Sequence, residues 1–419
     1  MKILVVGSGG REHDIIWNLS KSEKADKIYC APGNGGISEL AQCVNIGAME
    51  FDKLAEFAQK EKIDLTVVGM DDPLVGGIVD KFEEKGLRVF GPRANAAIIE
   101  GSKAFSKEFM KKYNIPTAKY ETFDNYDDAL TYVKNNSFPT VVKADGLALG
   151  KGVLICNDLN EAEAALKEIM IDKKFGESGN KVVIEEFLTG PEVSVLSFCD
   201  GKTIVPMVSA QDHKRALDGN KGLNTGGMGT FSPSRYYTED IAKECMEKIF
   251  VPTVEGLNKE GRSFKGIIFF GLMLTENGPK TIEYNCRFGD PETQVVLPRL
   301  KTDLVDIFEA CVDGTLDKMN VEWEDNAAAC VILASGGYPQ SYAKGYEISG
   351  CENVNAEKNL YVYHAGTKKE NGKYLTNGGR VLGVTGTAKT LDEAIKTAYS
   401  GVEMIKFKDM HYRKDIGKH

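Results

Sequence analysis

Short apolar runs alternate with helically spaced apolar residues through the first hundred positions. Runs within 3–6, 27–30, 65–68 and 88–90 each stop at or near glycine or proline, as buried strands do. Between them apolar residues recur every three or four positions, which predicts helices, one of them over 74–82. Strands that alternate with helices indicate βαβ units and a parallel sheet, which binds ligands at the carboxyl ends of its strands.

The pattern changes after Gly101 and again near residue 326. Mixed short strands and helices fill about 122–190, a long helix is expected over 239–259, and an Asn-Gly turn joins two strands within 266–284. The third block opens with an apolar strand and ends in a helix. We therefore expect an α/β and α+β multidomain protein. Its parts are an N-terminal parallel-sheet βαβ domain (1–101), a central domain (102–325) with a small subdomain at about 122–190, and a small β-rich α+β C-terminal domain (326–419).

Composition and charge exclude several classes of protein. The 419 residues carry 52 basic and 61 acidic side chains, whereas a non-specific nucleic-acid binder needs a basic face. Nine cysteines without a Cys-x-x-Cys pair argue against a disulfide framework and favour a reducing compartment. No apolar stretch approaches the ~20 residues that cross a bilayer, and the N-terminus enters a strand directly, without a signal peptide. We expect a soluble cytoplasmic protein with no nucleic-acid or membrane partner.

Glycine is over-represented, at 44 residues, and its clusters mark candidate ligand loops. Segment 7–12 (GSGGRE) follows the first strand and opens a helix, so its backbone N–H groups suit a phosphate or another anion. Glu12 stands where a dinucleotide-binding loop has its last glycine, which argues against a nicotinamide dehydrogenase. Segment 31–36 (APGNGG) ends the second strand and is expected to form another wall of the same pocket, although alone it is no more specific than a loop.

A further glycine cluster, 144–153, follows Lys143 at a strand end. A flexible Gly-rich hairpin lets backbone N–H groups approach a polyphosphate, and Lys143 and Lys103 are candidate cations for it. The segment is not a Walker A loop, because no Gly-Lys-Ser/Thr follows at the required spacing. A plain β-hairpin with solvated lysines explains each feature taken singly.

Other segments offer polar groups to a ligand. Segment 184–192 couples strand-edge backbone, which can read an adenine edge, to glutamates that can bind ribose hydroxyls; exposed charges at a strand end are the alternative. Segments 211–215 and 224–229 supply cations and open glycine backbone, which suits an anionic substrate. A lone His213 would more often be structural, but the two cations beside it and the glycines after it favour a ligand site.

Segment 283–292 is the most specific. In a strand, Glu283 and Asn285 face the same side and present oxygen ligands, which suits Mg²⁺ bridging to nucleotide phosphates. Arg287 shares that side and can bind a carboxylate or phosphate. Cys286 points the other way, so we assign it to the core, and no Ser-His-Asp or Cys-His arrangement is evident.

The third block adds two motifs. HAGT at 364–367 and NGGR at 377–380 stand out from their surroundings. An Asn-Gly pair between β segments predicts a hairpin, and Arg380 directly after it is a candidate cap of the substrate cleft.

Taken in order, these motifs resemble the ATP-grasp superfamily, and within it the phosphoribosylamine–glycine ligases of purine biosynthesis. The match runs from end to end of the chain. It rests on segments 9–13, 31–34, 100–103, 143–152, 211–215, 224–229, 283–292, 364–367 and 377–380. The resemblance implies that 102–325 is an ATP-grasp domain whose lid is the subdomain at about 122–190.

The resemblance also implies a reaction. ATP phosphorylates the glycine carboxylate, and the amine of 5-phosphoribosylamine attacks the resulting glycyl phosphate, giving glycinamide ribonucleotide, ADP and phosphate. The implied cofactor is Mg²⁺ or Mn²⁺, with ATP as co-substrate. The implied metal ligands are Glu283 and Asn285, and the implied catalytic residues are Arg287, Lys214 and Asp212. The implied ATP-binding residues are Lys103, Lys143, Gly150, Lys151, Gly152, Glu185, Phe187, Leu188 and Glu192. The implied substrate-binding residues are Gly9, Gly10, Arg11, Gly33, Asn34, Asp212, Lys214, Gly226, Gly227, Arg287, Gly379 and Arg380.

The implied partners are small molecules: glycine, 5-phosphoribosylamine and ATP. We expect a monomer or weak dimer, and a transient contact with the enzyme that produces phosphoribosylamine. The chain departs from the family at Gly69-Met70-Asp71, where the family usually reads Gly-Pro-Glu near an expected ribose contact. Two alternatives stay open: another ATP-grasp activity on a purine intermediate, such as carboxylation or formylation, and a nucleotide-binding sensor without turnover.

Overall fold

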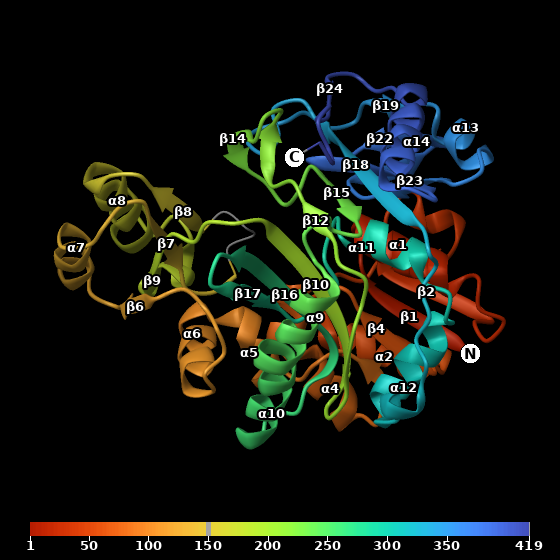
Figure 1. The fold of residues 1–419 in the computed structure, drawn as a ribbon. Coiled ribbons are helices and arrows are strands. Elements are labelled where there is room, and N and C mark those ends of the chain that lie inside the picture. Colours follow the sequence, from red (N-terminus) through yellow and green to blue (C-terminus); the bar gives the residue numbers. More distant parts are fainter. Residues whose placement is uncertain (148–151, 419) are drawn as a thin grey trace.

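The structure, a computed structural model, describes residues 1–147 and 152–418 (Figure 1). Its N-terminal part is the predicted parallel sheet, in the order β3-β2-β1-β4-β5. The strands are β1 (Lys2–Gly7), β2 (Lys27–Pro32), β3 (Gln42–Cys43), β4 (Leu65–Val68) and β5 (Val89–Phe90), and the helices are α1 (Gly10–Leu19), α2 (Phe51–Glu61), α3 (Asp71–Val75), α4 (Ile78–Glu84) and α5 (Ala94–Gly101). The single helix predicted over 74–82 is wrong: α3 and α4 are separate, because Gly77 between them has a left-handed φ of 91°.

A small subdomain projects to one side of the molecule (Figure 1). It is a four-stranded sheet in the order β6-β9-β7-β8, with its own apolar core. Its elements are β6 (Tyr120–Phe123), α7 (Tyr126–Lys134), β7 (Thr140–Ala144), β8 (Val153–Cys156), α8 (Leu159–Leu166) and β9 (Val182–Glu186). Strands β7 and β8 pair as an antiparallel hairpin around the Gly-rich segment, whose residues 148–151 lie outside the described part. Below we call this subdomain the lid.

The central sheet has the order β11-β10-β16-β17 and is antiparallel. Its strands are β10 (Glu192–Asp200), β11 (Ile204–Pro206), β16 (Lys265–Thr275) and β17 (Gly278–Asn285); the surrounding helices are α6 (Lys103–Lys112), α9 (Glu239–Cys245), α10 (Val251–Lys259), α11 (Thr293–Val296) and α12 (Leu304–Asp313). The long helix expected over 239–259 is interrupted by one π-helical turn, Met246–Phe250, between α9 and α10.

The C-terminal sheet has the order β12-β15-β18-β23-β20, and β24 also pairs with β18. Its strands are β12 (Gln211–Asp212), β15 (Gly229–Ser232), β18 (Ala327–Ser335), β20 (Leu360–His364), β23 (Arg380–Ala388) and β24 (Met410–His411), and helix α14 (Leu391–Met404) lies against it. Because β12 and β15 come from the central segment, the sheet crosses the boundary expected near residue 326, and the bounds 102–325 and 326–419 stay predictions. The other elements are the hairpin β13 (Arg215–Leu217) and β14 (Lys221–Asn224), strands β19 (Glu347–Ile348), β21 (Thr367–Glu370) and β22 (Lys373–Thr376), and helix α13 (Cys351–Ala356).

The hairpin predicted at Asn377-Gly378 is wrong. Strand β22 before it pairs with β19 and β21, whereas β23 after it pairs with β18 and β20, so this segment connects two sheets. Glycine at position 378 instead allows the backbone to pass close to Gly366, since a Cβ atom on Gly378 would lie 2.8 Å from the Cα of Gly366. Within 1–147 and 152–418, the helices are all too short or too polar to cross a bilayer.

Candidate active site

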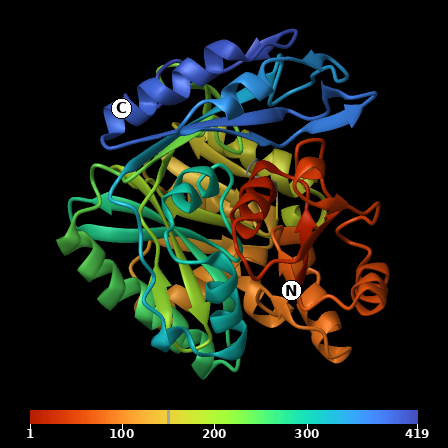
Figure 2. The same cartoon turned by 90° about the vertical axis from the view of Figure 1, so that its right-hand side faces the viewer.

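A polar cavity of about 330 Å³ lies where the N-terminal, central and C-terminal segments meet. Helix α1 packs against β20, so the N-terminal elements lie beneath the C-terminal sheet (Figure 2). The volume is within the range of small-molecule sites. Residues that line the cavity include Ser8, Gly9, Gly33, Asn34, Asp290, Gly366 and Arg380. Four of them, Gly9, Gly33, Asn34 and Arg380, are predicted substrate-binding residues.

The loop at 7–12, which is predicted to bind an anion, contains the carboxylate of its own residue Glu12. The buried Glu12 carboxylate accepts the Gly9 N–H at 2.6 Å and pairs with Arg11 Nε at 2.5 Å. Gly69 makes room for it, because a Cβ atom there would lie 2.2 Å from Glu12 Oε1. Arg11 also donates to the Phe288 carbonyl at 3.0 Å, so its guanidinium is held in one orientation beside the cavity. Sequence reasoning used Glu12 only to exclude a dinucleotide loop and missed this role.

Three other predicted residues, one asparagine and two glycines, determine how the loops pack. The Asn34 side chain donates to the carbonyls of Ser8 at 2.9 Å and His364 at 2.7 Å, and its oxygen accepts N–H groups of Gly36 and Ile37. It therefore joins the N-terminal loops to the end of β20. The predicted Gly10 lies against Gln294, and the predicted Gly379 against the Tyr338 ring, where a Cβ atom would clash at 2.7 Å and 2.3 Å respectively.

Arg380 reaches across the cavity to the central segment. Its Nη1 donates to the carbonyls of Gly226 and Asp290, both at 2.7 Å, and its Nη2 lies 3.4 Å from the Asp290 carboxylate. Burial alone raises the pKa of Asp290, but Arg380 and Arg11 lower it below its usual value. The pair thus joins the cavity to the loop of Gly226 and Gly227.

Asp212 and Lys214 lie on the other side of that loop. A Cβ atom on Gly227 would lie 2.7 Å from Asp212 Oδ1, so glycine permits the close approach. Burial raises the pKa of Asp212 well above its ordinary value, and Glu292 adds to the effect. Lys214 Nζ lies 2.5 Å from Glu192 and 3.8 Å from Glu283. Partial burial lowers the pKa of Lys214, but these carboxylates more than offset it, so the pKa is raised.

The residues predicted to bind ATP gather between the lid and the central sheet. Lys143 on β7 pairs with Glu185 on β9 at 2.8 Å, and both side chains are buried. Lys103 at the start of α6 donates to the Gly146 carbonyl at 2.8 Å, and burial lowers its pKa. Phe187, directly after β9, is 39% exposed. The structure also describes the predicted residues Leu188, half-buried, and Gly152, buried, whereas Gly150 and Lys151 lie outside the described residues.

Glu283 and Asn285 face the same side of β17, because Tyr284 between them points into the core. Burial raises the pKa of Glu283, but Lys214, Lys143 and Lys103 lower it overall, which keeps the carboxylate in the ionised form that binds metals. In the described part of the chain, no three His, Cys, Asp or Glu side chains form a metal-sized group. One carboxylate and one amide oxygen fit Mg²⁺, which commonly takes one or two protein ligands and completes its shell from phosphates and water.

Arg287 is held by two carboxylates. Its Nη2 lies 3.1 Å from Glu100 and 3.8 Å from Asp71, and both raise its pKa against the effect of burial. Glu100 also accepts the N–H of Cys286 at 2.6 Å. The buried Cys286 has a raised pKa, which agrees with its assignment to the core. Asp71 stands where the family usually has glutamate, and its carboxylate lies beside Arg287. The position of Glu100 in the sequence gave no indication that it contacts Arg287.

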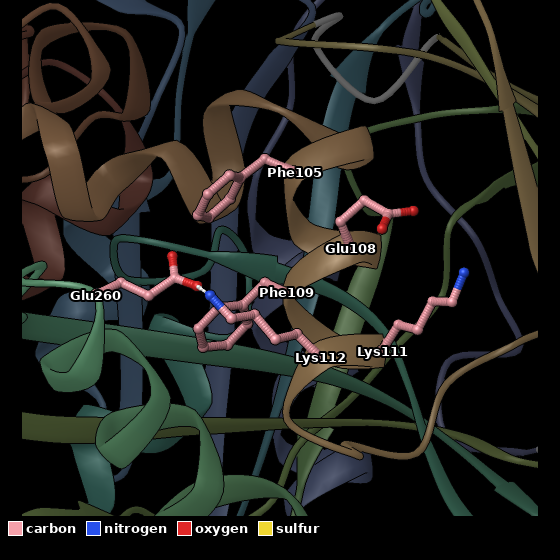
Figure 3. Close-up of a pocket in the computed structure, with 6 residues that line it drawn as sticks. All are labelled: Phe105, Glu108, Phe109, Lys111, Lys112 and Glu260. Carbon is pink, nitrogen blue, oxygen red and sulfur yellow. Dashed lines mark hydrogen bonds and ion pairs between the residues drawn. The ribbon is translucent and has the colours of Figure 1, made fainter.

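A second, larger groove of about 470 Å³ lies on α6 and the end of α10 (Figure 3). Phe105 and Phe109 form its apolar part, and Lys112 pairs across it with Glu260 at 2.8 Å. None of the predicted site residues lines it. The candidate residues gather instead around the polar cavity and the lysines beside it.

Comparison with known proteins gives one consistent family. Models of the phosphoribosylglycinamide synthetase N domain, ATP-grasp (A) domain and C domain match residues 1–100, 101–293 and 328–419. A phosphoribosylamine–glycine ligase of Clostridium acetobutylicum is 53% identical over 418 residues and 100% of both chains. The crystal structure of a phosphoribosylamine–glycine ligase from Thermotoga maritima superposes with a TM-score of 0.87, at 34% identity over 100% of both chains. A biotin carboxylase of Campylobacter jejuni shares the fold alone, with a TM-score of 0.75 at 12% identity over 98% of this chain and 92% of that one. The chain therefore belongs to the phosphoribosylglycinamide synthetase family.

Proposed function

We propose that this chain ligates glycine to 5-phosphoribosylamine, with ATP cleaved to ADP and phosphate, and forms glycinamide ribonucleotide in purine biosynthesis. One observation carries the proposal. The loop of Gly226 and Gly227 contacts Arg380 at the polar cavity on one side and the region of Asp212 and Lys214 on the other. Gly226 accepts from Arg380 at the cavity, and Gly227 packs on Asp212 beside Lys214. A phosphorylated sugar amine in the cavity would then meet an activated carboxylate near Glu283.

The chemistry needs positioning and charge stabilisation more than a covalent nucleophile. A carboxylate is a poor electrophile, so transfer of the γ-phosphoryl group to glycine creates a glycyl phosphate with a good leaving group. The amine nitrogen then attacks the carbonyl carbon and forms the C–N bond, phosphate departs with the C–O bond electrons, and the nitrogen releases one proton to solvent or to the departing phosphate. We assign Lys103 and Lys143 to the ATP phosphates, Glu185, Phe187, Leu188 and Glu192 to adenosine, and Arg287 to the glycine carboxylate.

The remaining roles follow the same placement. Arg11 and Arg380, with the glycine backbone of their loops, would hold the sugar phosphate, and Asp212 and Lys214 would border the reacting amine. Glu283 and Asn285 would hold Mg²⁺ or Mn²⁺. The metal supplies charge neutralisation on the transferring phosphoryl group when bound. The lid subdomain would cover the phosphates and exclude water from the acyl phosphate.

We further propose a cytoplasmic location, a monomer or weak dimer, and a transient contact with the enzyme that supplies phosphoribosylamine. The small-molecule partners are glycine, 5-phosphoribosylamine and ATP. The proposed transient contact follows from the reaction, which consumes an unstable amine.

The experiment measures ADP release with Mg-ATP and glycine, with and without phosphoribosylamine generated in place. Release that needs both substrates, together with glycinamide ribonucleotide in the mass spectrum, is the expected result. Turnover only with a different purine intermediate would contradict the proposal. Glu283→Gln should abolish metal-dependent turnover, whereas Glu276→Gln, at the exposed turn before β17, should leave it unchanged.

A further inference from the structure

Lys107 is a buried lysine on α6, one helical turn after Lys103, and none of the assignments above includes it. Its side chain is 3% exposed. Its Nζ lies 3.0 Å from Glu185 Oε2 and donates to Thr117 Oγ1 at 2.8 Å. A fully buried lysine is rare unless it is paired, so these contacts account for its charge.

Glu185 is thereby held between two lysines. Lys107 binds its Oε2 and Lys143 binds its Oε1, at 3.0 Å and 2.8 Å. Two ammonium groups thus share one carboxylate in a buried place, and Glu186 and Glu283 act on them only through space. Burial, opposed by Glu185, lowers the pKa of Lys107 to about 8. A polyphosphate on Lys143 would supply the negative charge that the cluster lacks.

Thr117 extends the contact to the central sheet. Its hydroxyl accepts from Lys107 and donates to the Thr281 carbonyl at 2.6 Å, and Thr281 N–H donates to the Pro116 carbonyl at 2.7 Å. Thr281 lies on β17, two residues before Glu283. Lys107 is therefore ion-paired on one side with the lid strand β9 and is linked on the other, through Thr117, to the strand that carries the candidate metal ligands.

We propose that Lys107 is a positioning residue for nucleotide: it fixes Glu185, and through it the Lys143 ammonium, at a set place relative to β17. The inference rests on the proposed function in one respect, that Glu185 and Lys143 bind the nucleotide. Lys107 itself contacts no substrate. Its loss would leave Glu185 held by the ion pair with Lys143 alone, so neither side chain would be anchored to β17.

The test measures Mg-ADP binding by titration calorimetry to the full-length protein. Lys107→Met and Glu185→Gln should each weaken the affinity by about tenfold, the scale of one charged hydrogen bond. The affinity of the double variant should lie within about twofold of the affinity of the weaker-binding single variant, because the two residues act through one contact. Lys111→Met is the matched control, since Lys111 is exposed on the same helix (Figure 3), and should bind as the parent protein does.

The outcomes separate this inference from the proposed function. Parent-like binding by Lys107→Met, or losses that multiply in the double variant, would overturn the positioning role. If Lys107→Met does not fold, Lys107→Gln, which keeps a donor near Thr117, carries the same test. A parent protein that binds Mg-ADP yet makes no glycinamide ribonucleotide would end the proposed function alone. The KM for glycine should stay within about twofold in Lys107→Met, which a general loss of structure would not allow.

Discussion

Replacing Glu100 with Gln tests how Arg287 is held. The Glu100 carboxylate receives only donors: the Cys286 N–H at 2.6 Å, the Cys286 thiol at 2.9 Å and Arg287 Nη2 at 3.1 Å. A Gln side chain has the same shape but must turn its NH₂ group toward one of these donors. One charge-assisted hydrogen bond is then lost and two donors face each other.

The magnitude follows from these contacts. Losing a hydrogen bond between charged groups costs about 1.5–3 kcal/mol, and a buried donor without an acceptor adds about 1–3 kcal/mol. Removing one member of a buried ion pair costs about 3–5 kcal/mol, but Asp71 stays 3.8 Å from Arg287 and retains part of the pairing. We therefore expect Glu100→Gln to lower the free energy of unfolding by about 3 kcal/mol.

The assay combines urea unfolding with steady-state kinetics. The kcat/KM for glycine should fall by about tenfold or more, because a shift of Arg287 that costs 1.4 kcal/mol has that effect, while the KM for ATP changes little. Glu84→Gln, at an exposed glutamate on α4, is the control and should match the parent protein. Parent-like stability and glycine kinetics in Glu100→Gln would refute the view that Glu100 holds Arg287.

Three further predictions concern the cavity and its walls. Gly36→Ala should destabilise the protein by about 1–3 kcal/mol and weaken phosphoribosylamine use, because the new Cβ atom would lie 2.3 Å from the His364 ring. The backbone at Gly36, with φ −79°, accepts alanine, so the clash alone is responsible. Gly47→Ala, whose Cβ atom meets only the Glu50 side chain, is the control in urea unfolding. Burial lowers the pKa of His13 to about 3 and that of His364 to about 4, below the ~6.5 of histidine in an unfolded chain. Because the unfolded state then binds more protons, the urea concentration at the unfolding midpoint should fall as the pH drops from about 6.5 toward 4. A midpoint that does not change across that range would contradict these pKa shifts. Arg380→Ala should raise the KM for phosphoribosylamine by about tenfold and leave that for ATP unchanged, and equal effects on both would remove Arg380 from the sugar-phosphate site.

Local periodicity predicted the elements that carry the site. The placement of Glu283 and Asn285 on one face of β17 follows from the two-residue period of a strand, and the buried Tyr284 confirms it. The alternation of strands and helices likewise predicted the parallel N-terminal sheet, and the glycine clusters marked loops that do border the cavity. These features depend on neighbours within a few residues, which a single sequence displays.

Contacts between distant segments could not be predicted in this way. Glu100 lies 186 residues from Cys286, and nothing in the spacing of either residue indicates their hydrogen bond. The pairing of β12 and β15 with the C-terminal sheet is equally a product of tertiary packing. At Asn377-Gly378 a local rule gave the wrong answer, because the close approach of Gly366, and not a two-residue turn, requires glycine there.

The candidate site also shows a pattern that no single motif displays. Each of four cations assigned to ligands already has a carboxylate beside it: Arg11 with Glu12, Arg287 with Glu100, Lys143 with Glu185 and Lys214 with Glu192. Such pairs orient the cations before a ligand arrives, so little reorganisation is needed when phosphate or carboxylate groups bind. The carboxylates also limit the surplus positive charge of a cleft that must release ADP and phosphate as well as bind ATP. Replacing one of these carboxylates should therefore act mainly by disturbing the orientation of its partner cation. If the carboxylate acted only through its charge, Glu100→Gln would impair the use of every substrate alike. Because Glu100 instead orients Arg287, we expect Glu100→Gln to affect the use of glycine selectively.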